Sequence, residues 1–326
     1  MNKRNYYKLK SINNIVFLGY SEVFEDLIRI NKELNLKSEI ITSNSFKRNL
    51  KGFKFKVFKK IDKSFFKYIE NKYKIENTLF ISLGARWIFS KKTIDKLKNR
   101  LLNFHGSRLP FDAGGGSFSW RIMKNDRINS ILVHLVSEKI DEGSIIDYET
   151  NLFTKCHKTP IEFKLKYLND FKKFYKAFIS KIKSGYKFEL LSQTNYLSNY
   201  YPRLNSKTDA WVDWSLEPNQ LENFINAFDD PYSGAITKIN NKIVKIKKIQ
   251  LHGGEVIPHK YMTGLIVRND KKWIVVCTAG NSYLIIEEVL DSQKKNMIGK
   301  LKVGDRFYTP LKNIITSKSK RTKFSK

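Results

Sequence analysis

Apolar and polar positions in the first third of the chain alternate between two periodicities. Four mainly apolar runs have the length of a strand; they lie at 14–19, 39–42, 78–83 and 101–105. Segments 22–34 and 91–101 instead repeat apolar residues every three or four positions, which is typical of amphipathic helices. Strands that alternate with helices predict βαβ units, and therefore an α/β fold with a Rossmann-like, doubly wound sheet.

The first of these strands carries no dinucleotide-binding signature. Where a Rossmann enzyme would place its GxGxxG loop, residues 19–22 read Gly-Tyr-Ser-Glu. Those glycines are what allow the backbone to approach a pyrophosphate closely. A nicotinamide-dependent enzyme is therefore disfavoured.

The centre of the chain predicts one long amphipathic helix. Thr159 and Glu162 have the spacing of a capping box, with Pro160 at the first helical position, and helix-spaced apolar residues continue to Gly185. The polar, Tyr- and Asn-rich segment 192–207 that follows has the composition of a linker.

Beyond residue 213 the pattern becomes that of a β-rich domain. After a short helix near 219–228, turns rich in Gly, Asn and Asp separate five strand-length runs, at 234–239, 242–249, 264–267, 273–278 and 282–289. Closely spaced strands favour a small barrel-like fold. We therefore expect an α/β domain over 1–190, a linker over 191–210 and a smaller β-rich domain over 211–326.

Composition excludes several classes of protein. Apolar residues occupy 41% of the 326 positions, too many for a disordered polycation, and no run approaches the ~20 apolar residues of a membrane helix. The apolar run near the basic start covers only residues 15–18, so no export signal is expected. Cys156 and Cys277 lie far apart without a CxxC partner, which argues against a disulfide scaffold or a Cys-based zinc site and suits a reducing cytoplasm.

The net charge of +30 comes from 61 Lys and Arg against 31 Asp and Glu. Such an excess is often the footprint of nucleic-acid binding. Here the lysines are spread evenly, and the only tight run is in the tail, where it comprises Lys318, Lys320, Arg321, Lys323 and Lys326. We expect mostly solvated surface charge, with affinity for a phosphate-bearing partner as the alternative.

The densest group of chemically useful side chains lies on the expected strand at 101–105. Residues two apart on a strand share a face, so Asn103 and His105 point the same way. At the carboxyl end of a parallel strand, where open α/β sheets bind ligands, this arrangement would place an amide beside an imidazole. A hydrogen-bonded structural histidine is the alternative explanation.

A carboxylate, Asp141, lies in the Asp-Glu-Gly turn at 141–143 between two apolar runs. Aimed at a neighbouring strand end, it would orient the His105 ring and favour its charged form. A purely local turn role is the alternative, because Asp and Gly suit turns. The other histidines, which we expect to be structural or loop residues without metal-like spacing, are His134, His157, His252 and His259.

In order and spacing these motifs resemble a known family. The run NFHGSRLP at 103–110, followed by the turn at 141–143, is similar to the Asn/His/Asp site of the 10-formyltetrahydrofolate-dependent formyltransferases. That family includes glycinamide ribonucleotide formyltransferase, methionyl-tRNA formyltransferase and the sugar N-formyltransferases. Segments 213–215 and 225–235 resemble the opening of the family's C-terminal domain, so the resemblance covers most of the chain.

The resemblance implies that 1–190 is a catalytic formyltransferase domain. A substrate amine would attack the formyl carbon of N10-formyltetrahydrofolate, a cosubstrate, and no metal would be needed. Asn103 and protonated His105 would stabilise the oxyanion, while Asp141 would keep His105 cationic and help to take the amine proton. Folate would bind to Asp141 and to segment 83–89, where the expected contacts are Gly84, Arg86, Trp87 and Ile88.

Departures from the family pattern bear on the acceptor. Methionyl-tRNA formyltransferases typically read His-Pro-Ser-Leu-Leu-Pro and then Arg-Gly-Ala-Ala, whereas this chain reads HGSRLP at 105–110 and FDAGGG at 111–116. Their long basic loop after the second strand is not recognisable within 42–59. Both differences favour a sugar N-formyltransferase, which acts on a nucleotide-linked amino sugar such as a dTDP-amino sugar for surface polysaccharide (lipopolysaccharide O-antigen) synthesis. Methionyl-tRNA formylation is the alternative.

A nucleotide sugar needs cations for its pyrophosphate and an aromatic surface for its base. The substrate-binding candidates are Arg108, Gly115, Phe118, Trp120 and Arg203. Each also has an ordinary explanation as a surface, packing or turn residue.

A second class of function stays open, namely a non-catalytic relative that binds a nucleotide or RNA. The presence of Asn103, His105 and Asp141 together argues against it, because a relative without catalytic activity has no need of these three side chains. The expected partners are folate and a nucleotide-linked amino sugar, in the cytoplasm and without membrane insertion. Nucleic acid is disfavoured, and a homodimer is one alternative for the association state.

Overall fold

The structure, a computed structural model, describes residues 5–43, 50, 52–115, 117–194, 198–254 and 256–319. Gly116, the tail residues Lys320, Arg321, Lys323 and Lys326, and positions 44–49 and 51 of the segment 42–59 lie outside the described residues. Contacts divide the chain into two compact units. The first comprises Met1–Ala113, Ile128–Asn151 and Lys166–Tyr200, and the second comprises Gly114–Arg127, Leu152–Leu165 and Tyr201–Lys326.

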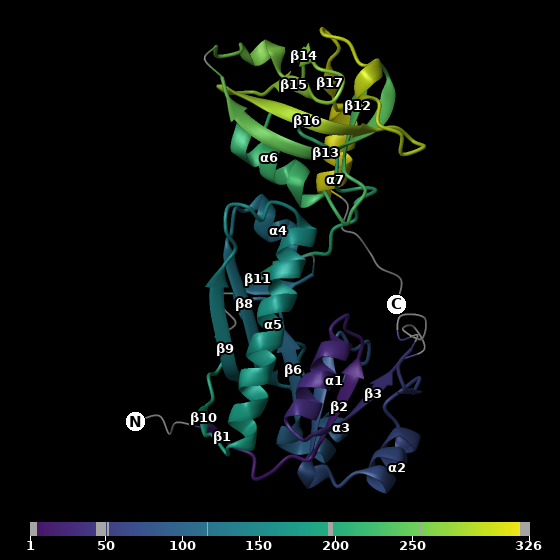
Figure 1. The fold of residues 1–326 in the computed structure, drawn as a ribbon, viewed down its shortest axis with the longest axis vertical. Helices are drawn as coiled ribbons and strands as arrows, with labels where there is room; N and C mark the ends of the chain where they lie inside the picture. Colours follow the sequence, from purple (N-terminus) through teal and green to yellow (C-terminus); the bar gives the residue numbers. More distant parts are fainter. Residues whose placement is uncertain are drawn as a thin grey trace. The chain divides into compact units, whose positions relative to one another are not determined.

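Both units are discontinuous in sequence, whereas the boundaries at 190 and 210 describe two single cuts; those boundaries stay a prediction. Figure 1 shows the elements, which in chain order are β1 Tyr6–Tyr7, β2 Asn14–Gly19, α1 Phe24–Glu33, β3 Lys37–Thr42, β4 Phe55–Val57, α2 Lys63–Lys72, β5 Thr78–Leu83, α3 Lys91–Leu97, β6 Leu101–His105, β7 Asp112–Gly114, α4 Ser117–Met123, β8 Ile128–Leu135, β9 Ile145–Leu152, α5 Pro160–Lys183, β10 Phe188–Glu189, β11 Asn199–Tyr201, α6 Pro218–Ala227, β12 Ala235–Ile239, β13 Lys242–Gly253, β14 Ile266–Asn269, β15 Ile274–Cys277, β16 Ser282–Leu290, β17 Phe307–Tyr308 and α7 Leu311–Ser319.

A seven-stranded sheet with the order β4-β3-β2-β5-β6-β8-β9 forms the centre of the first unit. Neighbours from β4 to β6 pair in parallel. Strand order runs outward from β2 in one direction and from β5 in the other, which confirms the expected Rossmann-like, doubly wound α/β fold. The sheet departs from a purely parallel one at β8, which pairs antiparallel with β6.

Helices cover both faces of this sheet because side chains alternate along each strand. On β2, Ile15 and Phe17 belong to a core that includes residues of α1 and α5. The intervening Val16 and Leu18 belong to the opposite core, with residues of α2 and α3. Continuous burial of both alternating sets explains why the strand reads as an uninterrupted apolar run.

Where strand order reverses, the ends of β2 and β5 approach closely. The Tyr20 amide donates to the Leu83 carbonyl over 2.8 Å. Gly19 and Gly84 both adopt positive φ, and a Cβ on Gly19 would lie 2.3 Å from the Leu83 oxygen. Only glycine permits this approach at the position where doubly wound sheets bind ligands.

The long helix α5 begins as its capping box predicts. Glu162 Oε2 accepts from the backbone amides of Lys158 and Thr159, each over 2.8 Å, and Pro160 is the first helical residue. The expected helix from 160 to Gly185 is confirmed to Lys183.

An antiparallel six-stranded sheet, in the order β14-β15-β16-β13-β12-β17, forms most of the second unit. Its two ends are also joined, since the Phe307 amide donates to the Gly264 carbonyl over 2.8 Å and Leu265 bridges to Arg306. The sheet therefore curls back on itself, and the expected β-rich, barrel-like fold is confirmed. β13 runs on to Gly253, four residues beyond the expected strand.

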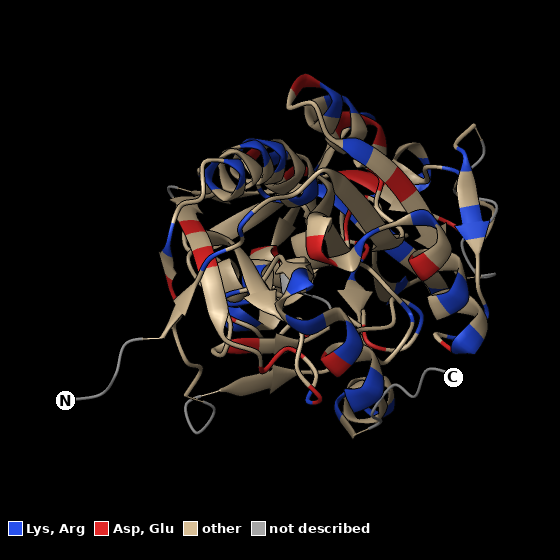
Figure 2. Cartoon of the chain, turned by 90° about the horizontal axis from the view of Figure 1, so that it is seen from below, with Lys and Arg blue, Asp and Glu red and all other residues tan. Residues whose placement is uncertain are grey.

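No helix among the described residues is both long and apolar enough to cross a bilayer. Lys and Arg occur on helices and strands throughout, with Asp and Glu interspersed (Figure 2). Many lysines are paired with acids on the surface, as in Lys176 with Glu33 and Lys248 with Glu288. The expectation of mostly solvated surface charge stays a prediction.

Candidate functional site

The polar side chains of strand β6 lie on one face of the sheet. Phe104 packs edge-on against Phe171 and Phe178 of α5, with ring centroids 5.6 and 5.5 Å apart. Because side chains alternate, Asn103 and His105 face the other side of the sheet, and both are half-buried. The shared face expected from the Asn-x-His spacing is therefore formed.

The carboxylate of Asp141 lies between two imidazoles. Its Oδ1 is 3.7 Å from His105 Nδ1 and 3.7 Å from His134 Nε2. The structure thus brings together the three residues that the sequence singles out, Asn103, His105 and Asp141, and adds His134 to them. At this distance the carboxylate favours the charged form of a nearby imidazole.

His134 contacts Asn103 directly. The two residues are opposite each other in the β6–β8 register, and Asn103 Nδ2 lies 3.0 Å from His134 Nε2. His134 is buried, and burial, the largest influence, lowers its pKa; the nearby charge of His105 also lowers it, while a hydrogen bond to Leu135 and the charge of Asp141 oppose the shift. The expectation that His134 is structural stays a prediction.

The Asp141 turn, residues 141–143, has a strained backbone that other groups hold in place. Asp141 adopts φ of +59°, and a Cβ on Gly143 would lie 1.7 Å from the Leu135 carbonyl oxygen. The side-chain amide of Gln193 donates to the carbonyls of Asp141 and Gly143 over 2.8 and 2.7 Å. A residue from the segment expected to be a linker therefore fixes the carboxylate's position.

Replacing Gln193 with Ala is expected to lower the free energy of unfolding by about 1–2 kcal/mol, since two hydrogen bonds at roughly 1 kcal/mol each are lost. Urea unfolding monitored by circular dichroism measures the change. Gln293→Ala, an exposed glutamine in a turn of the second unit, is the matched control and should stay near wild type. Equal stabilities of both variants would show that the two bonds contribute nothing.

Segment 84–89 connects β5 to α3 and presents unusual exposure. Gly84 has φ of +57°, Arg86 is exposed, and Ile88 is 77% exposed although it is apolar. The Trp87 indole donates to the Lys59 carbonyl over 3.3 Å, and Phe89 is buried.

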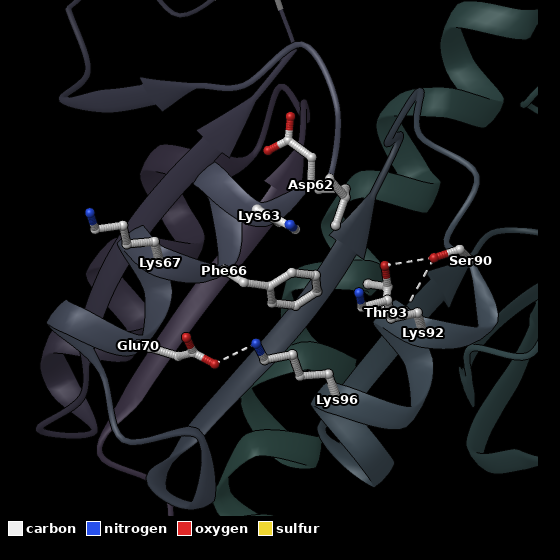
Figure 3. A pocket seen from close by; sticks show the side chains of 10 residues that line it. Asp62, Lys63, Phe66, Lys67, Glu70, Ser90, Lys92, Thr93 and Lys96 are labelled. Atoms are coloured by element: carbon white, nitrogen blue, oxygen red, sulfur yellow. Dashed lines mark hydrogen bonds and ion pairs between the residues drawn. The ribbon is translucent and has the colours of Figure 1, made fainter.

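Next to this segment, a cavity of about 420 Å³ lies between α2 and α3 (Figure 3). Its cationic lining residues are Lys63, Lys67, Lys92 and Lys96, and its acidic ones are Asp62 and Glu70. Asp62 caps α2 by accepting from the amides of Ser64 and Phe65, and Glu70 pairs with Lys96 over 2.5 Å. Cations therefore exceed acids in the lining, as an anionic ligand requires.

The substrate-binding candidates fall into two groups. In the second unit, the Trp120 indole donates to the Pro202 carbonyl over 2.7 Å and its ring lies 5.8 Å from that of Tyr201. The Arg203 side chain covers Gly115, where a Cβ would lie 2.1 Å from Arg203 Cγ. Gly115, Trp120 and Arg203 are thus brought together.

The other two candidates have different neighbours. Phe118 packs in a small core with Phe163, with ring centroids 6.2 Å apart. Arg108 belongs to the first unit, where its Nε lies 3.5 Å from Asp112 and its guanidinium stands over Phe111. No three His, Cys, Asp or Glu side chains converge as metal ligands in the part of the chain that the structure describes.

Comparison with protein families connects these features to a known chemistry. Residues 205–302 match the family model described as formyl transferase, C-terminal domain. Residues 205–302 are a formyl transferase C-terminal domain. The resemblance to the formyltransferases is thereby confirmed, and this domain includes α6 and the strands from β12 to β16.

Relatives of known sequence share this chemistry. The chain is 27% identical over 255 residues to the methionyl-tRNA formyltransferase of Prochlorococcus marinus strain MIT 9515, covering 70% of this chain and 75% of that one. Formyl transfer is the common activity, and the segment of similarity extends well beyond the C-terminal domain.

Solved structures of formyltransferases share the fold. WlaRD, a sugar 3-N-formyltransferase crystallised with dTDP and 5-N-formyl-THF, superposes with a TM-score of 0.63 at 19% identity, over 85% of this chain and 97% of that one. The N-formyltransferase of Helicobacter canadensis, in complex with folinic acid and dTDP-3-aminofucose, gives 0.60 at 18%, over 85% and 99%. The two kinds of comparison agree on formyl transfer and differ in the acceptor.

Proposed function

We propose that the chain is an N-formyltransferase that moves the formyl group of N10-formyltetrahydrofolate to the amine of a nucleotide-linked amino sugar, in the cytoplasm, for surface polysaccharide synthesis. The observation that carries the proposal is the convergence of Asn103, His105 and Asp141 at the carboxyl end of β6. Methionyl-tRNA formylation is the second candidate, because several relatives of known sequence carry that name.

The three residues suit the reaction step by step. The amine nitrogen forms a bond to the formyl carbon, whose oxygen becomes an oxyanion. The Asn103 amide and protonated His105 are preorganised donors for that oxygen. The amine gives up one proton, which Asp141 takes through a water, and N10 gains one as its bond to the formyl carbon breaks. Protons and charge therefore balance over the whole transfer.

We place the folate at the loop after β5, where strand order reverses, and in the cavity between α2 and α3. Segment 84–88 with Asp141 would hold the pterin ring, and the exposed Ile88 supplies apolar surface for it. The glutamate carboxylates at the other end of folate are anionic. The cavity between α2 and α3, which Ser90 also lines, contains four lysines in its lining. We therefore place the glutamate end in this cavity.

Charge reversal at Lys63 or Lys67 tests that placement. Lys63→Glu and Lys67→Glu are each expected to raise the KM for the folate about 30-fold, since each reversal replaces an attraction between unit charges worth roughly 1 kcal/mol with a repulsion of similar size. The increase should grow with the number of glutamates on the folate. Lys242→Glu on β13 is the control. Identical KM values for mono- and polyglutamates in all variants would contradict the placement.

A nucleotide-linked sugar as acceptor is supported by two features. Trp120, Tyr201 and Arg203 combine aromatic surface with a cation, as a base and a pyrophosphate require. The structures of similar fold include enzymes crystallised with dTDP or with dTDP-3-aminofucose.

Whether the protein acts as a homodimer is checked by sedimentation of the full chain.

The experiment is an acceptor panel. Purified protein is mixed with N10-formyltetrahydrofolate and either dTDP-amino sugars or methionyl-tRNA, and the release of tetrahydrofolate is followed spectroscopically. Turnover with a sugar that declines only modestly with ionic strength supports the proposal. Turnover with methionyl-tRNA alone, falling steeply with salt as phosphate-backbone binding does, would replace it. No turnover with any amine would favour the non-catalytic alternative.

A further inference from the structure

We propose that His134 is a positioning residue for the formyl transfer: its imidazole accepts a hydrogen bond from the Asn103 carboxamide and thereby directs the second amide N–H toward the formyl oxygen. The inference rests on the proposed function for its catalytic meaning. The structural part of the inference is that His134 has one fixed tautomer, and this can be measured without an assay of formyl transfer.

The contact is built into the sheet. Asn103 of β6 and His134 of β8 are opposite each other in the antiparallel register, so their side chains leave the sheet on the same face. Asn103 Nδ2 lies 3.0 Å from His134 Nε2, within hydrogen-bond distance. Both side chains are attached to rigid strands, so the pair needs no loop to hold it.

The second ring nitrogen decides the direction of this hydrogen bond. His134 Nδ1 lies 2.8 Å from the carbonyl oxygen of Leu135, and a carbonyl only accepts. Nδ1 therefore carries the proton, and in the neutral ring Nε2 offers a lone pair. Of the two ends of the Asn103 carboxamide, the NH₂ can donate to that lone pair and the oxygen cannot. The flipped carboxamide, with its oxygen toward the ring, is therefore ruled out.

The surroundings keep the ring neutral. His134 is 2% exposed, and burial, the largest influence, lowers its pKa; the hydrogen bond to Leu135 and the Asp141 carboxylate oppose the shift, and the positive charge of His105 adds to it. Asp141 Oδ1, at 3.7 Å from Nε2, is too distant for a hydrogen bond. Among the described residues, the charged groups that act on His134 are His105 on β6 and Asp141 in its turn.

A consequence follows for Asn103. One of its two amide hydrogens is used by His134, which fixes the plane of the carboxamide, and the other is left for the substrate side of the site. An amide free to rotate would present either an acceptor or a donor to the developing oxyanion, and only the donor stabilises it.

Two substitutions separate this role from simple packing. His134→Gln keeps an acceptor at the end of the side chain, and His134→Leu fills the space without one. We expect kcat to fall roughly 10–100-fold in the Leu variant, with KM for both substrates little changed, and to stay within several-fold of wild type in the Gln variant. Equal losses in both variants at equal thermal stability would overturn the proposal.

A double-substitution cycle with Asn103→Ala adds a second criterion. If His134 acts through Asn103, then His134→Leu should cause little further loss of kcat in the Asn103→Ala background. Independent losses that multiply would contradict the proposal, because they would mean that His134 acts without Asn103.

The tautomer itself is tested on the full-length protein by ¹⁵N NMR with labelled histidine. A protonated Nδ1 and an unprotonated Nε2 for His134, persisting at pH values where an exposed histidine titrates, are expected. A protonated Nε2, or a normal titration, would overturn the proposal. Because this readout needs no substrate, it distinguishes a failure of the His134 assignment from a failure of the proposed function, which would leave the NMR result intact.

Discussion

Replacing His105 with Ala is expected to lower kcat for formyl transfer about 10²–10³-fold. The imidazole is a donor for the oxyanion, and the loss of one such donor costs on this order. The Asp141 carboxylate at 3.7 Å would then have no cation to stabilise at that position. Steady-state release of tetrahydrofolate measures the effect, and Asn103→Ala is expected to give a loss of the same order.

The protein should stay folded in both variants. His105 and Asn103 are only half-buried, and no apolar core depends on them. His252→Ala, which removes an exposed histidine of the second unit, is the matched control for turnover. A His105→Ala enzyme with near wild-type kcat would exclude the assigned role.

Replacing Asp141 with Asn is expected to lower kcat about 10²-fold, at the lower end of what general-base assistance contributes. Asn is the informative substitution because the residue adopts φ of +59°, a conformation that Asn tolerates better than Ala or Leu does. The backbone of the turn is therefore kept while the charge is removed, and His105 loses the carboxylate that favours its cationic form.

The neighbouring Glu142 supplies the control. It lies in the same turn and pairs on the surface with Lys139 at 3.5 Å, so Glu142→Gln removes an equal charge one residue away. Its turnover should stay near wild type in steady-state assays across pH. Similar losses in both variants would assign the effect to the general field of the turn rather than to the Asp141 carboxylate.

The sequence predicted the parts of the fold that local pattern determines. β2, β5 and β6 are visible in the sequence as mainly apolar runs because most of their side chains are buried, and α5 because its capping box and apolar stripe agree. α2 was not predicted, although the spacing of Phe65, Phe66 and Ile69 carries a helical signal. The two-residue strand β17 is too short for any periodicity, and the tertiary closure onto Gly264 defines it.

The site was predictable in part, because the pattern of one strand indicates Asn103 and His105 and the Asp-Glu-Gly turn indicates Asp141. Asn103 and His105 share a face by alternation alone, whereas the contact of Asn103 with His134 depends on the β6–β8 register, which a pattern within one strand does not contain. Gln193 was missed for a similar reason, since its partners are backbone carbonyls some fifty residues earlier. Long-range hydrogen bonds to backbone leave no periodic trace in a sequence.

The Gln193 contacts bear on the modularity of the protein. Leu191 exchanges two backbone hydrogen bonds with Ile145, over 2.8 and 2.9 Å, and Gln193 fastens the Asp141 turn immediately afterwards. A fragment cut at residue 190 would therefore keep every residue assigned to the chemistry and still lose the groups that hold the carboxylate. In this protein, recombination or truncation that preserves the site must carry the chain through at least residue 193.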